Sequence, residues 1–99
     1  MAPFQNDDMK ELYKAVLCLK SVEECGNFFE DLCTIKELQD LSQRFAVARM
    51  LDAGDNYKSI SDATGVSTAT ISRVNKCLEY GSGGYRLVLD REKAGKEGK

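Results

Sequence analysis

The side chains of this sequence that are best suited to bind a ligand lie close together in residues 57–78. Hydroxyl groups and cations in this stretch can donate hydrogen bonds to phosphate oxygens and to the edges of bases. The methyl groups of Thr68 and Ala69 can contact the methyl group of thymine. We therefore expect this stretch to bind double-stranded DNA through Lys58, Ser59, Ser61, Ser67, Thr68, Ala69, Thr70, Ser72, Arg73 and Lys76.

Two short helices joined by a tight turn would hold these side chains on one surface. The sequence predicts a helix over 57–64, a turn over 65–67 and a second helix over 68–78. Gly65 accepts the positive φ that such a turn requires, and Ser67 can cap the second helix. The stretch therefore fits a helix-turn-helix, whose second helix enters the major groove with its N-terminal residues first.

The apolar residues of this stretch have the spacing of the buried contacts in a helix-turn-helix. Ser61 is small, as a close contact between the helices demands, whereas Thr64 is more polar than the usual residue there. A helical hairpin with only a packing role is the alternative interpretation. The predicted core residues are Ile60, Val66, Ile71 and Val74.

The sequence lacks the residues that would build a catalytic or metal site. It has no histidine, which removes the most common general base and zinc ligand. The spacing of Cys18, Cys25, Cys33 and Cys77 fits no zinc motif. We expect these cysteines to be small buried residues in a reducing compartment, and we expect no enzyme activity, no bound metal and no cofactor.

Helices are also predicted for the N-terminal half. Asp8, Ser21 and Thr34 are each followed three residues later by a glutamate, which is the pattern of a capping box. The third of these helices is the longest, at about residues 35–53, and Gly54 is placed to end it. Many apolar residues fall on the first two helices: Met9, Leu12, Tyr13, Val16, Leu17, Phe28, Phe29 and Leu32. Because a chain of 99 residues buries a small core, this surface favours a homodimer over an internal core.

The chain is expected to form one all-α domain with four segments. Residues 1–55 form the dimerisation core and residues 56–80 the helix-turn-helix. Residues 81–91 are predicted to be a short C-terminal helix: Tyr85, Leu87 and Leu89 alternate like a strand, but a lone strand has no partner here. Residues 92–99 are rich in Lys, Gly and Glu and are predicted to be a disordered tail.

The charge of the chain is unevenly distributed. The formal net charge is −2, yet residues 1–40 carry four basic and nine acidic side chains. Residues 56–78 carry three basic side chains and one acidic side chain, so an anionic partner is expected there. The sequence shows no signal peptide and no apolar stretch long enough to span a bilayer. We expect a cytoplasmic protein without a membrane partner.

Two strings in this sequence resemble the Trp repressor superfamily and its YerC/YecD branch. They are Ala-Thr-Ile-Ser-Arg at 69–73 and Tyr-Arg-Leu-Val-Leu-Asp-Arg at 85–91, and the resemblance covers about residues 8–91. It implies an all-helical, intertwined homodimer with two symmetric helix-turn-helix heads. It also implies a transcriptional regulator, most often a repressor, that reads a palindromic operator.

The resemblance also implies candidate ligand-binding residues. Arg44 and Arg73 match two arginines that hold the tryptophan co-repressor in the Trp repressor, and Thr34 matches a position near that ligand. Val74 stands where the repressor has a glycine that leaves room for the ligand, and Cys77 replaces a ligand-binding hydroxyl. A branched side chain would fill the pocket, which argues against tryptophan and leaves a different small-molecule effector open.

A protein-binding adaptor that has lost its DNA role is the alternative function. The acidic N-terminal half could contact another protein, and the positive charge of residues 56–78 is modest.

Overall fold

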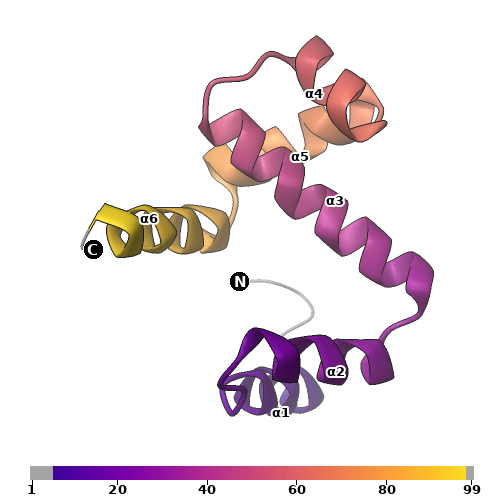
Figure 1. Cartoon of the computed structure of the whole chain (residues 1–99), viewed down its shortest axis with the longest axis vertical. Helices are drawn as coiled ribbons and strands as arrows, with labels where there is room; N and C mark the ends of the chain where they lie inside the picture. Colours follow the sequence, from indigo (N-terminus) through magenta and orange to yellow (C-terminus); the bar gives the residue numbers. More distant parts are fainter. Residues whose placement is uncertain (1–5, 98–99) are drawn as a thin grey trace. The chain divides into compact units, whose positions relative to one another are not determined.

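The computed structural model describes the backbone of residues 6–97 and side chains through residue 95. These residues form six helices and contain no strand, which confirms the predicted all-α fold with a helix-turn-helix (Figure 1). The helices are α1 (Asp7–Val16), α2 (Val22–Leu32), α3 (Ile35–Asp52), α4 (Tyr57–Thr64), α5 (Thr68–Tyr80) and α6 (Gly84–Glu97). No helix in the described residues is long and apolar enough to cross a membrane.

The chain divides into two compact units, and the division falls inside the long helix α3. The N-terminal unit ends at Leu38 and the C-terminal unit begins at Gln39. From the sequence we expect one domain in total, with all of α3 in the dimerisation core of residues 1–55. In the structure, the greater part of α3 instead belongs to the unit that holds the helix-turn-helix.

Side-chain caps start the helices of the N-terminal unit. The oxygen Oγ of Ser21 accepts the Glu24 N–H at 3.1 Å, which confirms that cap. Thr34 forms a complete capping box: its Oγ1 accepts the Glu37 N–H at 3.1 Å, and its own N–H donates to Glu37 Oε1 at 2.8 Å. The predicted cap at Asp8 is wrong, because α1 begins at Asp7 and its cap lies two residues before Asp8.

Asn6 caps α1 instead of Asp8. Its Oδ1 accepts the Met9 N–H at 2.9 Å, and Asp7 and Asp8 both lie in the first turn. Three consecutive side chains here can act as cap acceptors, so spacing alone does not choose among them. The two aspartates still favour this helix end, because carboxylates interact well with the positive end of the helix dipole.

The N-terminal unit leaves its apolar side chains either half-buried or exposed to solvent. No residue of α1 or α2 is buried, and Leu17 and Val22 are 83% and 90% exposed. Cys18 is also exposed, and Cys25 and Cys33 are half-buried. The prediction that the cysteines are buried is therefore wrong for this chain by itself, because its N-terminal helices do not enclose a core.

The C-terminal unit does have a buried core, and all four predicted helix-turn-helix residues belong to it. The cluster combines residues of α3, α4, the turn and α5. Gly54 ends α3 as predicted: its N–H donates to the Leu51 carbonyl, and the Asp55 N–H donates to the Met50 carbonyl, both at 3.0 Å. The core cluster consists of Val47, Ala48, Ile60, Val66, Ile71 and Val74.

The last helix extends further than the sequence predicts. α6 begins at Gly84 and ends at Glu97, so the prediction of a disordered tail is wrong for residues 92–97. Residues 98 and 99 lie outside the described residues. Leu89 of α6 is buried, and ion pairs join α6 to the end of α3. The bonded pairs are Asp52–Arg86 at 2.7 Å, Asp52–Lys93 at 2.7 Å and Arg49–Glu92 at 2.6 Å.

The first prediction concerns the turn glycine. Gly65 has a φ of +76°, a conformation that costs a residue with a Cβ atom roughly 1–2 kcal/mol. Gly65→Ala should therefore lower the free energy of unfolding by about 1 kcal/mol, measured by urea denaturation. Gly26→Ala is the matched control, because Gly26 is inside α2 and a Cβ atom there also meets open space. It should leave the protein as stable or more stable. An equal loss in both variants would contradict the assignment of strain to the turn.

The second prediction concerns Asp52, whose side chain is 10% exposed. Hydrogen bonds from Lys93 and then Arg86 hold the pKa of its carboxyl below 3.8. Because the folded pKa is depressed, the stabilisation is present above about pH 3.8 and is lost as pH falls through the lower folded value. Asp52→Asn should reduce stability at pH 7 by about 1 kcal/mol, and this difference from wild type should shrink in acid. Urea denaturation of both proteins at pH 7 and in acid measures this difference in stability. A difference that grows in acid would contradict the assignment.

Candidate nucleic-acid interface

The turn between α4 and α5 has its predicted geometry. Gly65 ends α4 in the left-handed region, and its N–H donates to the Ser61 carbonyl at 2.8 Å. Thr64, which is more polar than the usual residue at this position, forms hydrogen bonds within the turn. Its hydroxyl donates to the Ile60 carbonyl at 2.7 Å and accepts the Val66 N–H at 3.2 Å. A threonine therefore fits this position because it replaces hydrogen bonds that the end of a helix would otherwise lack.

The helix α5 starts at the predicted cap. The Oγ of Ser67 accepts the Thr70 N–H at 3.3 Å, and its hydroxyl donates to Thr70 Oγ1 at 3.2 Å. These two hydroxyls are thus partly engaged with each other, and Thr70 is half-buried. The remaining predicted contact residues of α5 are exposed: Thr68, Ala69, Ser72, Arg73 and Lys76. We call this set the α5 face.

The α5 face combines methyl groups, two hydroxyls and two cations on the side of the helix opposite its buried side. Ile71 and Val74, which alternate with it, are in the core. In the described residues neither Arg73 nor Lys76 has an ion-pair partner in the structure. Their charges are therefore available to an anion without first breaking an ion pair.

The start of α4 supplies the rest of the predicted set. Lys58 is exposed and forms only an i,i+4 pair with Asp62, at 3.4 Å, with both side chains largely in solvent. Such a pair contributes little and dissociates easily. Ser59 is exposed, and its N–H donates to the cap residue Asn56. Ser61 is half-buried, in keeping with a position at the contact between the helices.

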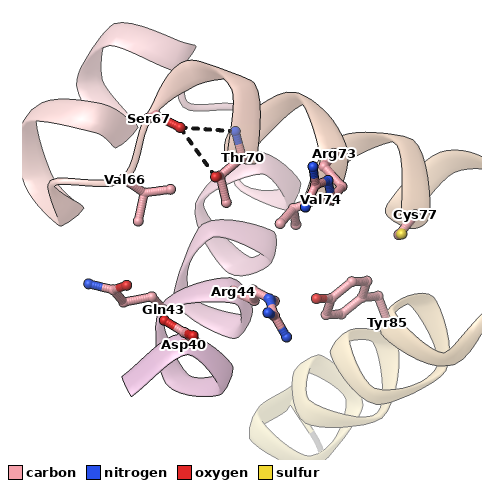
Figure 2. A pocket seen from close by; sticks show the side chains of 10 residues that line it. All are labelled: Asp40, Gln43, Arg44, Val66, Ser67, Thr70, Arg73, Val74, Cys77 and Tyr85. Atoms are coloured by element: carbon pink, nitrogen blue, oxygen red, sulfur yellow. Dashed lines mark hydrogen bonds between the residues drawn. The ribbon is translucent and has the colours of Figure 1, made fainter. Parts of the chain in front are cut away.

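A groove of about 530 Å³ lies beneath α5 within the C-terminal unit. Arg44 of α3 and Arg73 of α5, the two arginines paired by the resemblance, both line it (Figure 2). Thr34 belongs to the N-terminal unit, where it caps α3. The groove is lined by Asp40, Gln43, Arg44, Val66, Ser67, Thr70, Arg73, Val74, Cys77 and Tyr85.

Tyr85 of α6 is one of the groove residues that sequence reasoning missed. Figure 2 shows its ring reaching from α6 toward Arg44. Burial raises the pKa of the Tyr85 hydroxyl, helped by Cys77 and opposed by the Arg44 charge. The alternating pattern of residues 85–89 conceals its role, because only contacts with α3 and α5 show which side chain faces the groove. Asp40 and Gln43 were also missed, since they look like ordinary solvent-facing residues of a long helix.

The described residues include no group of three or more His, Cys, Asp or Glu side chains that could hold a metal ion. What the C-terminal unit offers instead is a rigid helix pair with an exposed, cationic, hydroxyl-bearing face. Such a face can bind phosphate oxygens and the edges of bases.

Known proteins resemble this chain over most of its length. The family model of the Trp repressor protein matches residues 7–93. The uncharacterised protein YerC of Bacillus subtilis (strain 168) is 54% identical over 86 residues, which are 87% of this chain and 83% of YerC. The crystal structure of a TrpR-like protein from Eubacterium eligens ATCC 27750 matches with a TM-score of 0.86 at 48% identity, covering 90% of this chain and 92% of that chain.

A second solved structure, of a protein from Staphylococcus aureus, gives a TM-score of 0.85 at 46% identity and covers 90% of this chain and 89% of its own. The sequence comparisons and the structure comparisons thus point to the same group of proteins. The chain belongs to the Trp repressor family.

Proposed function

We propose that this protein is a transcriptional regulator that binds a palindromic DNA operator through the α5 face. Membership in the Trp repressor family suggests a helix-turn-helix protein that binds DNA. The observation that carries the proposal is the α5 face itself, where donors and methyl groups project from a helix fixed by a buried core. A helical hairpin with only a packing role would have no need to keep Arg73 and Lys76 exposed and unpaired.

The residues of the two helices divide into those that position the protein and those that read sequence. Lys58 and Ser59, at the start of α4, suit contacts with the phosphate backbone. Thr68, Ala69 and Ser72, in the first turns of α5, suit contacts with base edges and thymine methyl groups. Arg73 and Lys76 lie further along α5 and add charge toward the phosphates.

The proposed active form is a homodimer assembled through the N-terminal unit. Its helices α1 and α2 bury no residue within this chain, so their apolar side chains need a partner. A second copy is the occupant that fits a palindromic site, because two heads bind two half-sites related by the same symmetry. Dimer formation also enlarges the core of a chain too short to bury much by itself.

We propose repression as the mode of regulation and the cytoplasm as the place of action. An effector in the groove is not required by the proposal. Val74, which is 3% exposed, forms part of the buried core at the groove wall and leaves no space of its own for a ligand ring. This supports the expectation that tryptophan is not the effector.

The third prediction concerns the salt dependence of DNA binding. The affinity for fragments selected from genomic DNA should fall as salt rises, with a log–log slope of about −0.9 for each phosphate contact. Arg73→Ala and Lys58→Ala should each weaken binding about tenfold and make the slope shallower by about one contact. Fluorescence anisotropy over a salt series measures both quantities.

Lys14→Ala is the matched control for these two variants. Like Lys58→Ala it removes an exposed lysine with a surface ion-pair partner, and like Arg73→Ala it removes one exposed positive charge, but Lys14 lies in α1 of the N-terminal unit. Its affinity and slope should match those of the wild type. A wild-type protein that binds no genomic fragment in a salt-dependent way, but captures a specific protein, would instead support the adaptor function.

The fourth prediction concerns the dimer. Leu17→Asp places a charge on the exposed apolar surface of the N-terminal unit and should raise the dissociation constant of the dimer by tenfold or more. Sedimentation equilibrium measures the effect against the 11.0 kDa of one chain. Asn27→Asp, which adds the same charge at an exposed polar position of α2, is the control and should leave the dimer intact. A wild-type protein that sediments as a monomer at micromolar concentration would contradict the proposed assembly.

A further inference from the structure

Tyr85 joins the three helices that surround the groove. It is the second residue of α6, and its half-buried ring packs against the core cluster to which Val74 belongs. It also lines the groove together with Arg44 of α3 and Cys77 of α5 (Figure 2). A single side chain from α6 thus lies next to the packing contact between α3 and the DNA-facing helix α5.

Ion pairs next to Tyr85 join α6 to the end of α3. The next residue, Arg86, donates to Asp52 near the end of α3 at 2.7 Å and to Asp90 at 3.1 Å. One and two turns further on, buried Leu89 and the Lys93–Asp52 pair fix the same helix. The first turn of α6 is therefore held on α3 by residue 86 while residue 85 faces the groove.

We propose that Tyr85 is a positioning residue for DNA binding, a built-in wedge that sets the orientation of α5 relative to α3. This inference rests on the proposed function. The reading helix, that is the DNA-binding helix α5, needs further contacts on the side that faces α3. The groove on that side is open, and only a few core residues connect α5 to α3. Because the ring of Tyr85 lines the groove and packs against the core cluster, the chain itself supplies part of these contacts. DNA binding then needs no small molecule to hold α5 in place.

The expected energetic signature follows from preorganisation. If α5 moves among several orientations, the apparent dissociation constant rises in inverse proportion to the fraction that fits the operator. The number of phosphate contacts in the bound state stays the same. Loss of the Tyr85 ring should therefore weaken binding without changing the salt slope, unlike the loss of a residue that contacts DNA.

The test compares variants of Tyr85 on a duplex that the wild-type protein has selected from genomic DNA. Tyr85→Ala should bind about tenfold more weakly with an unchanged salt slope, while Tyr85→Phe, which keeps the ring, should stay within twofold of wild type. Millimolar p-cresol, which is the tyrosine side chain as a free molecule, should restore part of the affinity of Tyr85→Ala and leave wild type unchanged, because it can refill the vacated space.

Tyr80→Ala is the matched control, since Tyr80 is 82% exposed at the end of α5 and its truncation should leave affinity unchanged. Circular dichroism checks that each variant is folded. If Tyr85→Ala does not fold, Tyr85→Leu replaces it and should still lose at least twofold with the same salt slope.

Three results would overturn the proposal. They are wild-type affinity in the folded truncation variant, a shallower salt slope that makes Tyr85 a DNA contact, and no recovery with p-cresol. A wild-type protein that binds no DNA would refute the proposed function itself, so the two failures are distinguishable.

Discussion

The left-handed turn at Gly65 is the constraint on which the rest of the C-terminal unit depends. With a φ of +76°, it reverses the chain so that α4 and α5 pack across Ile60, Val66 and Ile71. An eight-residue helix such as α4 is not stable by itself in water, so this packing is what makes it helical. The exposed side of α5 is a consequence of the same turn. Once one side of the helix is buried, the residues on its opposite side must face solvent.

The two units differ in how they bury apolar surface, which is difficult for a small chain. The C-terminal unit buries a core of its own, whereas α1 and α2 bury no residue. Most of the acidic side chains lie in residues 1–40, and the most basic stretch holds the α5 face. Under the proposed function, the residues that meet phosphate therefore lie in the part of the sequence that carries a net positive charge. The weak overall field should also keep binding to unrelated DNA low.

Local signals in the sequence predict much of this structure because they act over a few residues. The caps at Ser21, Thr34 and Ser67 depend on hydrogen bonds three residues apart, and Gly54 ends its helix through neighbouring carbonyls. The helix-turn-helix core follows from spacing in the same way. The extent of α6 does not follow from local signals, because long-range ion pairs stabilise this helix. The partners are 34 positions apart in the Asp52–Arg86 pair and 43 positions apart in the Arg49–Glu92 pair. The Lys, Gly and Glu composition of residues 92–97 favours disorder only when those partners are left out.

The residues that line the groove are also difficult to predict from local sequence. Arg44 and Arg73 could be paired from the sequence only through a family resemblance, and nothing local places Tyr85 beside them. A tyrosine in an alternating stretch is indistinguishable from its neighbours until α6 is fixed to Asp52 through Arg86. Support for the reading helix therefore depends on long-range charge pairs at the end of α3 as well as on the core. The groove then remains beneath α5, with Val74 and Tyr85 belonging to its walls and the two arginines at its edges. Under the proposed function, such a regulator would have its DNA-binding helix α5 positioned by its own fold, and protein concentration and dimer formation would set how often it occupies DNA.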